Sequence, residues 1–202
     1  TATSGRPGPV VLALPEDMLT EYADTKIINS YQKIEAYPSP ADLAQVEEML
    51  SKSKAPLMIV GGGGWDEASC QKIQDFAEKN HLPVGCSFRC QDYFDNRHPN
   101  YVGHIGIGLS TSLQDRIINS DLLVVIGARL GEVTTSGYSL LDIPKPKQQL
   151  IHIHSGAEEL GSVYQADLPI NASPRSFAEA ISQLEIAGSE KWASNTKQGN
   201  ED

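Results

Sequence analysis

The residues best suited to chemistry in this chain are glycines and one arginine that follow short apolar runs. Four consecutive glycines, Gly61 to Gly64, follow residues 57–60 and precede a helical pattern. Glycine there can let a phosphate approach main-chain N–H groups, or let one backbone pass close to another. Arg129 stands three residues beyond the apolar run that ends at Ile126, and a guanidinium can bond two phosphate oxygens. A nucleotide phosphate and simple tight packing both remain open interpretations of the glycines.

The glycine run does not match the dinucleotide-binding fingerprint. G-x-G-x-x-G would need a third glycine where Asp66 or Glu67 stands, and the next apolar run lacks a final acidic residue to bind a ribose hydroxyl. A nicotinamide-dependent dehydrogenase is therefore not indicated. Gly103 and Gly106 add a further glycine-rich stretch. Several glycine-bearing loops at one edge of a sheet make a better case for a nucleotide crevice than any one alone.

Other catalytic or metal-binding patterns are weak. Cys70, Cys86 and Cys90 match no common zinc site, and such a sparse, odd set favours a reducing compartment. His152 and His154 are interpreted as facing opposite sides of one strand. We therefore predict no catalytic residue and no metal ligand in this chain.

Composition narrows the class of partner. The chain has 202 residues, a formal net charge of −10 and a pI near 4.9, which argues against a nucleic-acid partner. No apolar run approaches the roughly 20 residues that cross a bilayer, so no membrane partner is expected. The first residues lack the apolar centre of a signal peptide, and we expect a cytoplasmic protein.

The elements that must position these residues alternate along the chain. Helical patterns follow Ser39 and Ser173, each with a proline at the first helical position, and two more cover residues 66–80 and the region of 113–118. Apolar runs predict strands at residues 57–60, 83–87, 121–127, 149–153 and 167–170. This alternation predicts an α/β fold, Rossmann-like and doubly wound, with a mostly parallel sheet and helices on both faces.

The two ends of the chain differ from this central part. Residues 10–14 are predicted to form one strand between prolines, and residues 17–38 are predicted to form a linker. The polar tail, residues 188–202, is predicted to be a disordered linker. The alternating pattern occupies residues 39–187, which we expect to form the domain. Residues 88–108 read as a long irregular segment.

The order of motifs resembles the central domain of thiamine-diphosphate-dependent enzymes of the acetolactate synthase type. The matching pieces are KAPLMIVGGG, HPNYVGHIGIG, SDLLVVIGARLGEVTT, LIHIHSGAEELG and ADLPINAS. They cover residues 38–184, in the family's order and at its spacing. The opening GRPGPVVLALPEDM is similar to the end of the preceding, pyrimidine-binding domain, which assigns residues 1–16 to that domain.

The resemblance implies a middle third of a three-domain enzyme. Thiamine diphosphate would bind between the first and last domains, usually across a dimer interface, with magnesium held by a G-D-G segment that this chain does not contain. This part alone is then noncatalytic, and its partners are the other domains of a homo-oligomer. The full-length protein would be a transferase or lyase that decarboxylates a 2-keto acid or adds to a carbonyl.

The resemblance also bears on a nucleotide in the central domain, where relatives hold FAD, ADP or nothing. The residues that match the flavin-contacting pattern are Gly62, Gly63, Gly103, Gly106 and Arg129. Flavin-binding relatives read HIDID where this chain reads HIHSG, so His154 and Gly156 replace two acidic residues. FAD or ADP therefore remains an open expectation.

The sequence is also compatible with two other classes to different degrees. A free-standing nucleotide-binding or regulatory module is the alternative hypothesis, and a detached apolar strand before a linker argues against it. A sirtuin-type NAD-dependent deacetylase would usually need a four-cysteine zinc site, which three cysteines do not provide.

Overall fold

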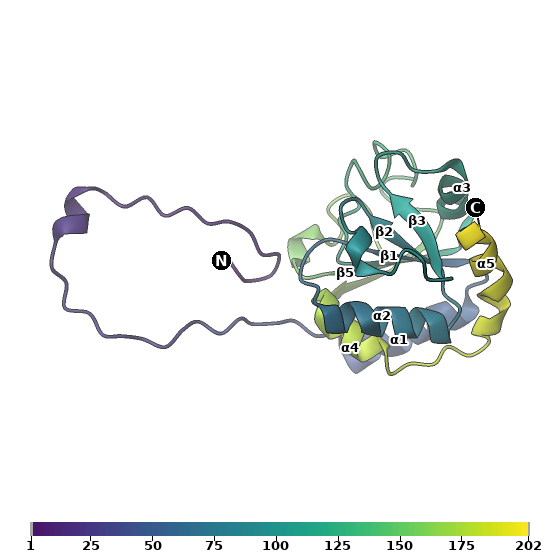
Figure 1. Cartoon of the computed structure of the whole chain (residues 1–202), viewed down its shortest axis with the longest axis horizontal. Helices are drawn as coiled ribbons and strands as arrows, with labels where there is room; N and C mark the ends of the chain where they lie inside the picture. The colour runs from purple at the N-terminus through teal and green to yellow at the C-terminus, as the bar shows by residue number, and fades with distance from the viewer. Residues whose placement is uncertain (1, 202) are drawn as a thin grey trace.

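Six parallel strands form the centre of the molecule, and the computed structural model describes residues 2–201 of the chain (Figure 1). The strand order is β3-β2-β1-β4-β5-β6, with every neighbouring pair parallel. The strands are β1 (Pro56–Val60), β2 (Val84–Ser87), β3 (Tyr101–Ile105), β4 (Leu122–Ile126), β5 (Gln149–His154) and β6 (Leu168–Asn171). The order runs outward in both directions from β1 and β4, which confirms the Rossmann-like, doubly wound α/β fold.

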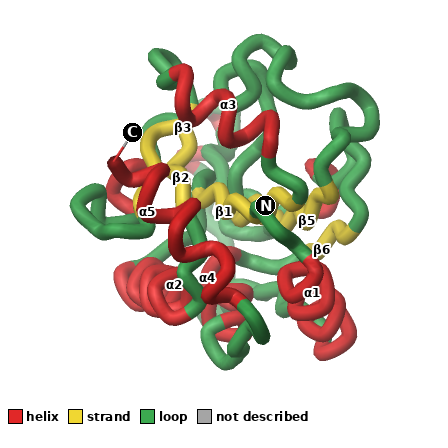
Figure 2. The backbone as a smooth tube through the Cα atoms, turned by 90° about the vertical axis from the view of Figure 1, so that its right-hand side faces the viewer, coloured by secondary structure: helices red, strands yellow, loops and turns green. Residues whose placement is uncertain are grey.

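Helices cover both faces of this sheet (Figure 2). The α-helices are α1 (Pro40–Lys52), α2 (Glu67–Lys79), α3 (Thr111–Asn119), α4 (Pro174–Ile181) and α5 (Ala193–Glu201). Short 3-10 turns are η1 (Asp17–Thr20), η2 (Gln91–Tyr93), η3 (Ala157–Glu159) and η4 (Ser189–Trp192). Ser39 and Ser173 each accept a backbone N–H of the first helical turn, as their sequence positions predict.

The two-residue period of the strands divides the core into two layers. Met58 and Val60 of β1 pack with α1, α2 and α4 on one face, where Phe76 and Phe177 are buried. Leu57 and Ile59 of the same strand face the opposite layer, which holds α3. Because β1 and β4 are buried on both faces, their sequences are continuous apolar runs rather than alternating ones.

Strand β3 was not predicted, since residues 88–108 read as irregular. Its sequence YVGHI contains Gly103 at φ +121°, and the β2–β3 register shifts near Gly85. An edge strand that is only partly buried, with a glycine inside it, gives a weak periodic signal. The pairing with β2 nevertheless extends the sheet by one strand.

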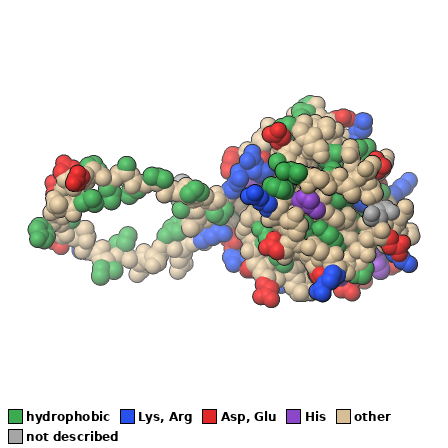
Figure 3. Space-filling view, turned by 45° about the horizontal axis from the view of Figure 1, so that its top comes forward, with side chains coloured by type: hydrophobic (Ala, Val, Ile, Leu, Met, Phe, Trp, Pro, Cys, Tyr) green, Lys and Arg blue, Asp and Glu red, His purple; other side chains and the backbone are tan. Residues whose placement is uncertain are grey.

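The N-terminal residues 2–38 form an extended arm with exposed apolar side chains, visible as the long loop in Figure 1 and in Figure 3. The strand expected at residues 10–14 is wrong for the described chain, because those residues lie exposed and have no neighbouring strand to complete a ladder. Residues 17–38 are irregular apart from η1. The division of the chain into domains stays a prediction.

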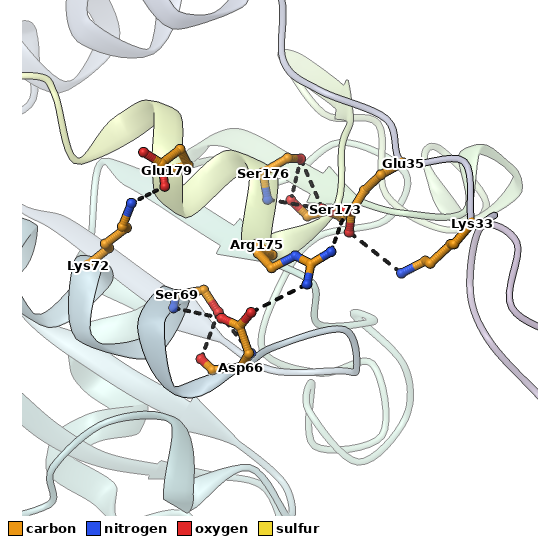
Figure 4. Close-up of polar contacts among 9 residues, drawn as sticks. All are labelled: Lys33, Glu35, Asp66, Ser69, Lys72, Ser173, Arg175, Ser176 and Glu179. Carbon is orange, nitrogen blue, oxygen red and sulfur yellow. Dashed lines mark hydrogen bonds and ion pairs between the residues drawn. The ribbon is translucent and has the colours of Figure 1, made fainter.

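The end of this arm is fastened to α4 by a small polar network (Figure 4). Arg175 pairs with Glu35 at 2.6 Å and with Asp66 at 3.5 Å, so one guanidinium joins the arm, α4 and the start of α2. The Ala36 carbonyl accepts from the Ser173 N–H at 3.1 Å and from a neighbouring serine hydroxyl. These contacts fix where the arm meets the domain.

The C-terminal residues fold onto the domain, which corrects the expectation of a disordered tail for 188–202; Asp202 lies outside the described residues. Trp192 is fully buried and its indole N–H donates to Ser53 O at 3.1 Å. Thr196 donates to His81 O at 2.6 Å, and Asn200 donates to Tyr101 O at 2.9 Å. The polar composition predicted disorder because it contains a single large aromatic residue. That residue is buried, and several polar side chains nearby donate hydrogen bonds to carbonyl groups of the domain.

Candidate functional site

A cleft of about 730 Å³ opens where the strands end. The turns that follow β1, β2, β4 and β5 of the sheet form its walls. Two residues of the N-terminal arm complete the lining. The lining residues that carry the argument are Arg6, Gly62, Gly63, Arg129, Glu132 and His154. Ligands of open parallel sheets bind at this carboxyl edge, and the volume suits a small organic ligand.

The glycine run serves both packing and an open surface. Gly62 has φ +70°, and a Cβ built on it would lie 1.9 Å from Gly127 O, so only glycine fits between the β1 and β4 turns. A Cβ on Gly63 would meet nothing within 4 Å, because Gly63 faces the cleft. The packing interpretation therefore holds for Gly62, whereas Gly63 leaves the surface of the cleft open and its phosphate-binding role stays a prediction.

Two carbonyl groups of this turn accept hydrogen bonds from aromatic side chains. Trp65 Nε1 donates to Gly61 O at 2.8 Å, and the Tyr93 hydroxyl donates to Gly62 O at 2.8 Å. No described atom accepts from the N–H groups of Gly62, Gly63 or Gly64. The turn thus presents free donors beside the cleft, which is how a backbone concavity binds an anion.

The start of α2 is less available to an anion than its position suggests. Asp66 caps this helix and accepts from the Ser69 N–H at 2.8 Å. Hydrogen bonds from Ser69 hold the pKa of the Asp66 carboxyl below its usual range, so the cap is negatively charged near neutral pH. The negatively charged cap makes the helix terminus a poorer place for an anion than the glycine turn.

Two arginines line the cleft. Arg129 follows β4, and its Nε lies 2.8 Å from the Glu159 carboxylate, while about half of its side chain stays exposed. Arg6, which the sequence reading did not single out, reaches the same cleft from the arm. No local signal could have found it, because Arg6 and its neighbour Pro7 lie more than 50 residues from the other lining residues. Glu132 is the acidic residue that lines the cleft.

The remaining predicted site residues lie elsewhere. Gly103 is inside β3, and a Cβ there would lie 3.1 Å from Leu113 Cδ2, so this glycine permits close packing against α3. Gly106 follows β3 and lines an adjoining hollow of about 500 Å³ that shares Glu132 and Val133 with the main cleft. The structure brings Gly62, Gly63 and Arg129 together, places Gly106 beside them and leaves Gly103 outside both hollows.

The two histidines of β5 lie on the same face of the sheet, which corrects the expectation that they face opposite sides. Residues two apart on a strand share a face, and the ring centroids of His152 and His154 are 6.2 Å apart. His154 lines the cleft, and its Nδ1 accepts from the Gly156 N–H at 3.1 Å. His152 is buried, and its Nε2 lies 3.0 Å from Ala128 O.

Other reactive groups are not poised for chemistry. Burial raises the pKa of the Cys86 thiol to about 12 and that of Cys70 to about 11, which keeps both protonated. Within residues 2–201, no group of three or more His, Cys, Asp or Glu side chains could hold a metal ion. Over the same residues, no helix is long and apolar enough to cross a bilayer.

Fold and cleft together define an α/β domain with a crevice lined by glycines and arginines at the carboxyl edge of its sheet. A profile of the family described as "Thiamine pyrophosphate enzyme, central domain" matches residues 43–181, more than half of the chain. The chain belongs to this family, as its motifs predicted.

Curated relatives agree with this assignment. The chain is 26% identical to a probable acetolactate synthase large subunit of Methanocaldococcus jannaschii, over 95% of this chain and 34% of the relative. It is 25% identical to the acetolactate synthase isozyme 2 large subunit of Escherichia coli, over 90% and 33%. A large subunit from Corynebacterium glutamicum is 27% identical over 86% and 28%. The chain therefore spans about a third of the length of these relatives.

Proposed function

We propose that this chain is the noncatalytic central domain of a larger acetolactate synthase-like enzyme, in which it binds the diphosphate of FAD or ADP. The observation that carries the proposal is the convergence of free N–H groups on Gly62, Gly63 and Gly64 with Arg129 at one cleft. Main-chain donors and a guanidinium are the groups that proteins use to bind diphosphates. Arg6 adds a second positive charge.

The cleft fits such a ligand in charge and shape. A carboxylate-rich site would repel a diphosphate, whereas the lining of this cleft contains two arginines and one carboxylate, that of Glu132. Arg129 is already held by Glu159, so its guanidinium is ordered before a ligand arrives. The adjoining hollow at Gly106 gives a longer nucleotide such as FAD room that ADP would leave unused.

The activity of the whole protein is a proposal that rests on the family. Thiamine diphosphate, bound with magnesium by other domains, would supply the thiazolium that stabilises a carbanion during decarboxylation of a 2-keto acid or carbonyl addition. We assign the steps of that reaction to the other domains. We further propose a cytoplasmic homo-oligomer in which this domain contacts its neighbours.

Calorimetric titration of the purified chain with FAD, with ADP, and with thiamine diphosphate plus magnesium tests the proposal. Micromolar binding of FAD or ADP is expected, and Arg129→Ala should weaken it by roughly tenfold or more, since a charge-assisted hydrogen bond is lost. Arg97→Ala is the matched control, because Arg97 is 92% exposed and pairs with Asp95 outside the cleft.

The comparison of ligands separates the outcomes. Equal loss in both variants would refute a specific role for Arg129. Binding of neither nucleotide would refute the nucleotide proposal. Tight binding of thiamine diphosphate by this chain would contradict the assignment of that cofactor to other domains. To distinguish FAD from ADP, Ile107→Glu at the adjoining hollow should weaken FAD alone, because Ile107 lines that hollow and not the main cleft.

A further inference from the structure

The buried His152 side chain has one ring nitrogen without a protein partner among the described residues. His152 is 3% exposed, and its Nε2 is 3.0 Å from Ala128 O. A carbonyl oxygen can only accept, so Nε2 carries the proton and Nδ1 presents a lone pair. Burial lowers the pKa of His152, which keeps the ring neutral. Nδ1 is buried, and no described atom hydrogen-bonds to it.

A second buried polar group belongs to a residue in the wall of the same cavity, Tyr164. Its hydroxyl meets hydrogen-bond geometry with no described atom; burial raises its pKa, and a weaker hydrogen-bonding influence of the Thr135 side chain lowers it. His152 and Tyr164 both line a small cavity of about 10 Å³, together with Glu159 and Ser162. That volume is about the space that one water molecule needs, and the walls offer the several polar partners that a buried water requires.

We propose that this cavity binds one structural water, which bridges His152 Nδ1 and the Tyr164 hydroxyl. The water donates one hydrogen to the imidazole lone pair and accepts the phenol hydrogen. Its second hydrogen faces the wall that contains Glu159. Both buried groups are then satisfied, as nearly all buried polar groups in folded proteins are.

The same cluster makes His152 a positioning residue for Arg129. Its Nε2 holds the Ala128 carbonyl, which belongs to the residue directly before Arg129. The wall of the water cavity includes Glu159, whose carboxylate holds the Arg129 Nε at 2.8 Å. His152 thus holds the main chain next to the arginine, and Glu159, in the wall of the same cavity, holds its side chain. The consequence for ligand binding rests on the proposed function, whereas the water site does not.

Two measurements on the unliganded chain test the water site directly. A crystal structure at atomic resolution should show one water within hydrogen-bonding distance of His152 Nδ1 and the Tyr164 hydroxyl. Nitrogen-15 NMR should show His152 with a protonated Nε2 and an unprotonated Nδ1 at neutral pH. A Tyr164 hydroxyl that donates its hydrogen to a protein atom, or a protonated Nδ1, would overturn the proposal.

Variants test the positioning role. His152→Gln can still donate to Ala128 O and accept from the water, so nucleotide affinity should stay within about threefold; His152→Leu removes both groups and should weaken it by about tenfold. Both variants are compared at matched folded fraction by circular dichroism. Equal affinity in wild type and His152→Leu would overturn the role. Absence of nucleotide binding in the wild type would refute the proposed function, while the crystallographic and NMR results would still decide the water site.

Discussion

Replacing single glycines of the turn after β1 should separate its packing role from its binding role. Gly62→Ala places an L-residue at φ +70°, which costs about 1–2 kcal/mol by itself. Its Cβ would also lie 1.9 Å from Gly127 O, so the β1 and β4 turns must move apart. Because those turns end two central buried strands, we expect a total loss of stability above about 3 kcal/mol.

Gly63→Ala is the matched control within the same turn. Gly63 has no left-handed φ, and its added methyl would meet nothing within 4 Å. The change should leave the free energy of unfolding within about 1 kcal/mol of the wild type, in the stabilising direction, since alanine restricts the unfolded chain. The methyl group nevertheless enters the cleft, so affinity for FAD or ADP should fall while stability does not.

Urea denaturation followed by tryptophan fluorescence measures the first effect, and calorimetric titration measures the second. The reasoning would be refuted if Gly62→Ala unfolded within about 1 kcal/mol of the wild type, or if both variants lost equal stability. Unchanged nucleotide affinity in Gly63→Ala would show that the ligand does not approach the turn.

Three other perturbations test elements around the site. Trp192→Ala should cost about 3–5 kcal/mol in urea denaturation, because the side chain is fully buried against the domain; a loss under 1 kcal/mol would contradict docking of the C-terminal residues. Asp121 is partly buried, which opposes its charge, yet hydrogen bonds from Ser53 and two backbone N–H groups hold its pKa below the usual range. A carboxyl whose pKa is lowered in the folded state stabilises the protein above about pH 4, and this contribution is lost as the pH falls through the folded-state pKa. In Asp121→Asn the free energy of unfolding should therefore fall less steeply with decreasing pH than in the wild type. An unchanged slope would contradict a role for the Asp121 charge. Arg175→Ala should lower the free energy of unfolding by under about 1 kcal/mol, because the carboxylate partners of Arg175 are partly exposed. The same change should speed tryptic cleavage at Lys33, since it frees the end of the arm. An unaltered cleavage rate would show that other contacts hold the arm.

Strong local signals made most of the domain predictable. Ser39 and Ser173, each followed by proline, marked helix starts that the structure confirms. The uninterrupted apolar runs of β1 and β4 marked the buried centre of the sheet. These features depend on a few neighbouring residues and on burial from both faces, so they are visible without knowledge of distant contacts.

The failures concern features that only distant contacts create. Strand β3 pairs along one edge and includes Gly103, so its pattern is too weak to detect. The C-terminal residues looked disordered because Trp192 is a single apolar residue among polar ones. Arg6 lines the cleft only because the arm returns to the domain. Gly62, Gly63 and Arg129 do share a cleft, whereas their binding role stays a prediction.

The attachment of α5 to β3 has a consequence for solubility. As the outermost strand, β3 would present unpaired main-chain groups to any extended segment that approached. The Asn200 side-chain amide Nδ2 donates a hydrogen bond to the Tyr101 carbonyl oxygen at 2.9 Å, and α5 lies beside the strand (Figure 2). Cutting the chain after residue 187 would uncover that edge as well as the surface beneath Trp192. Such a shortened domain should therefore self-associate through strand addition, and we expect residues 188–201 to prevent this in the longer chain.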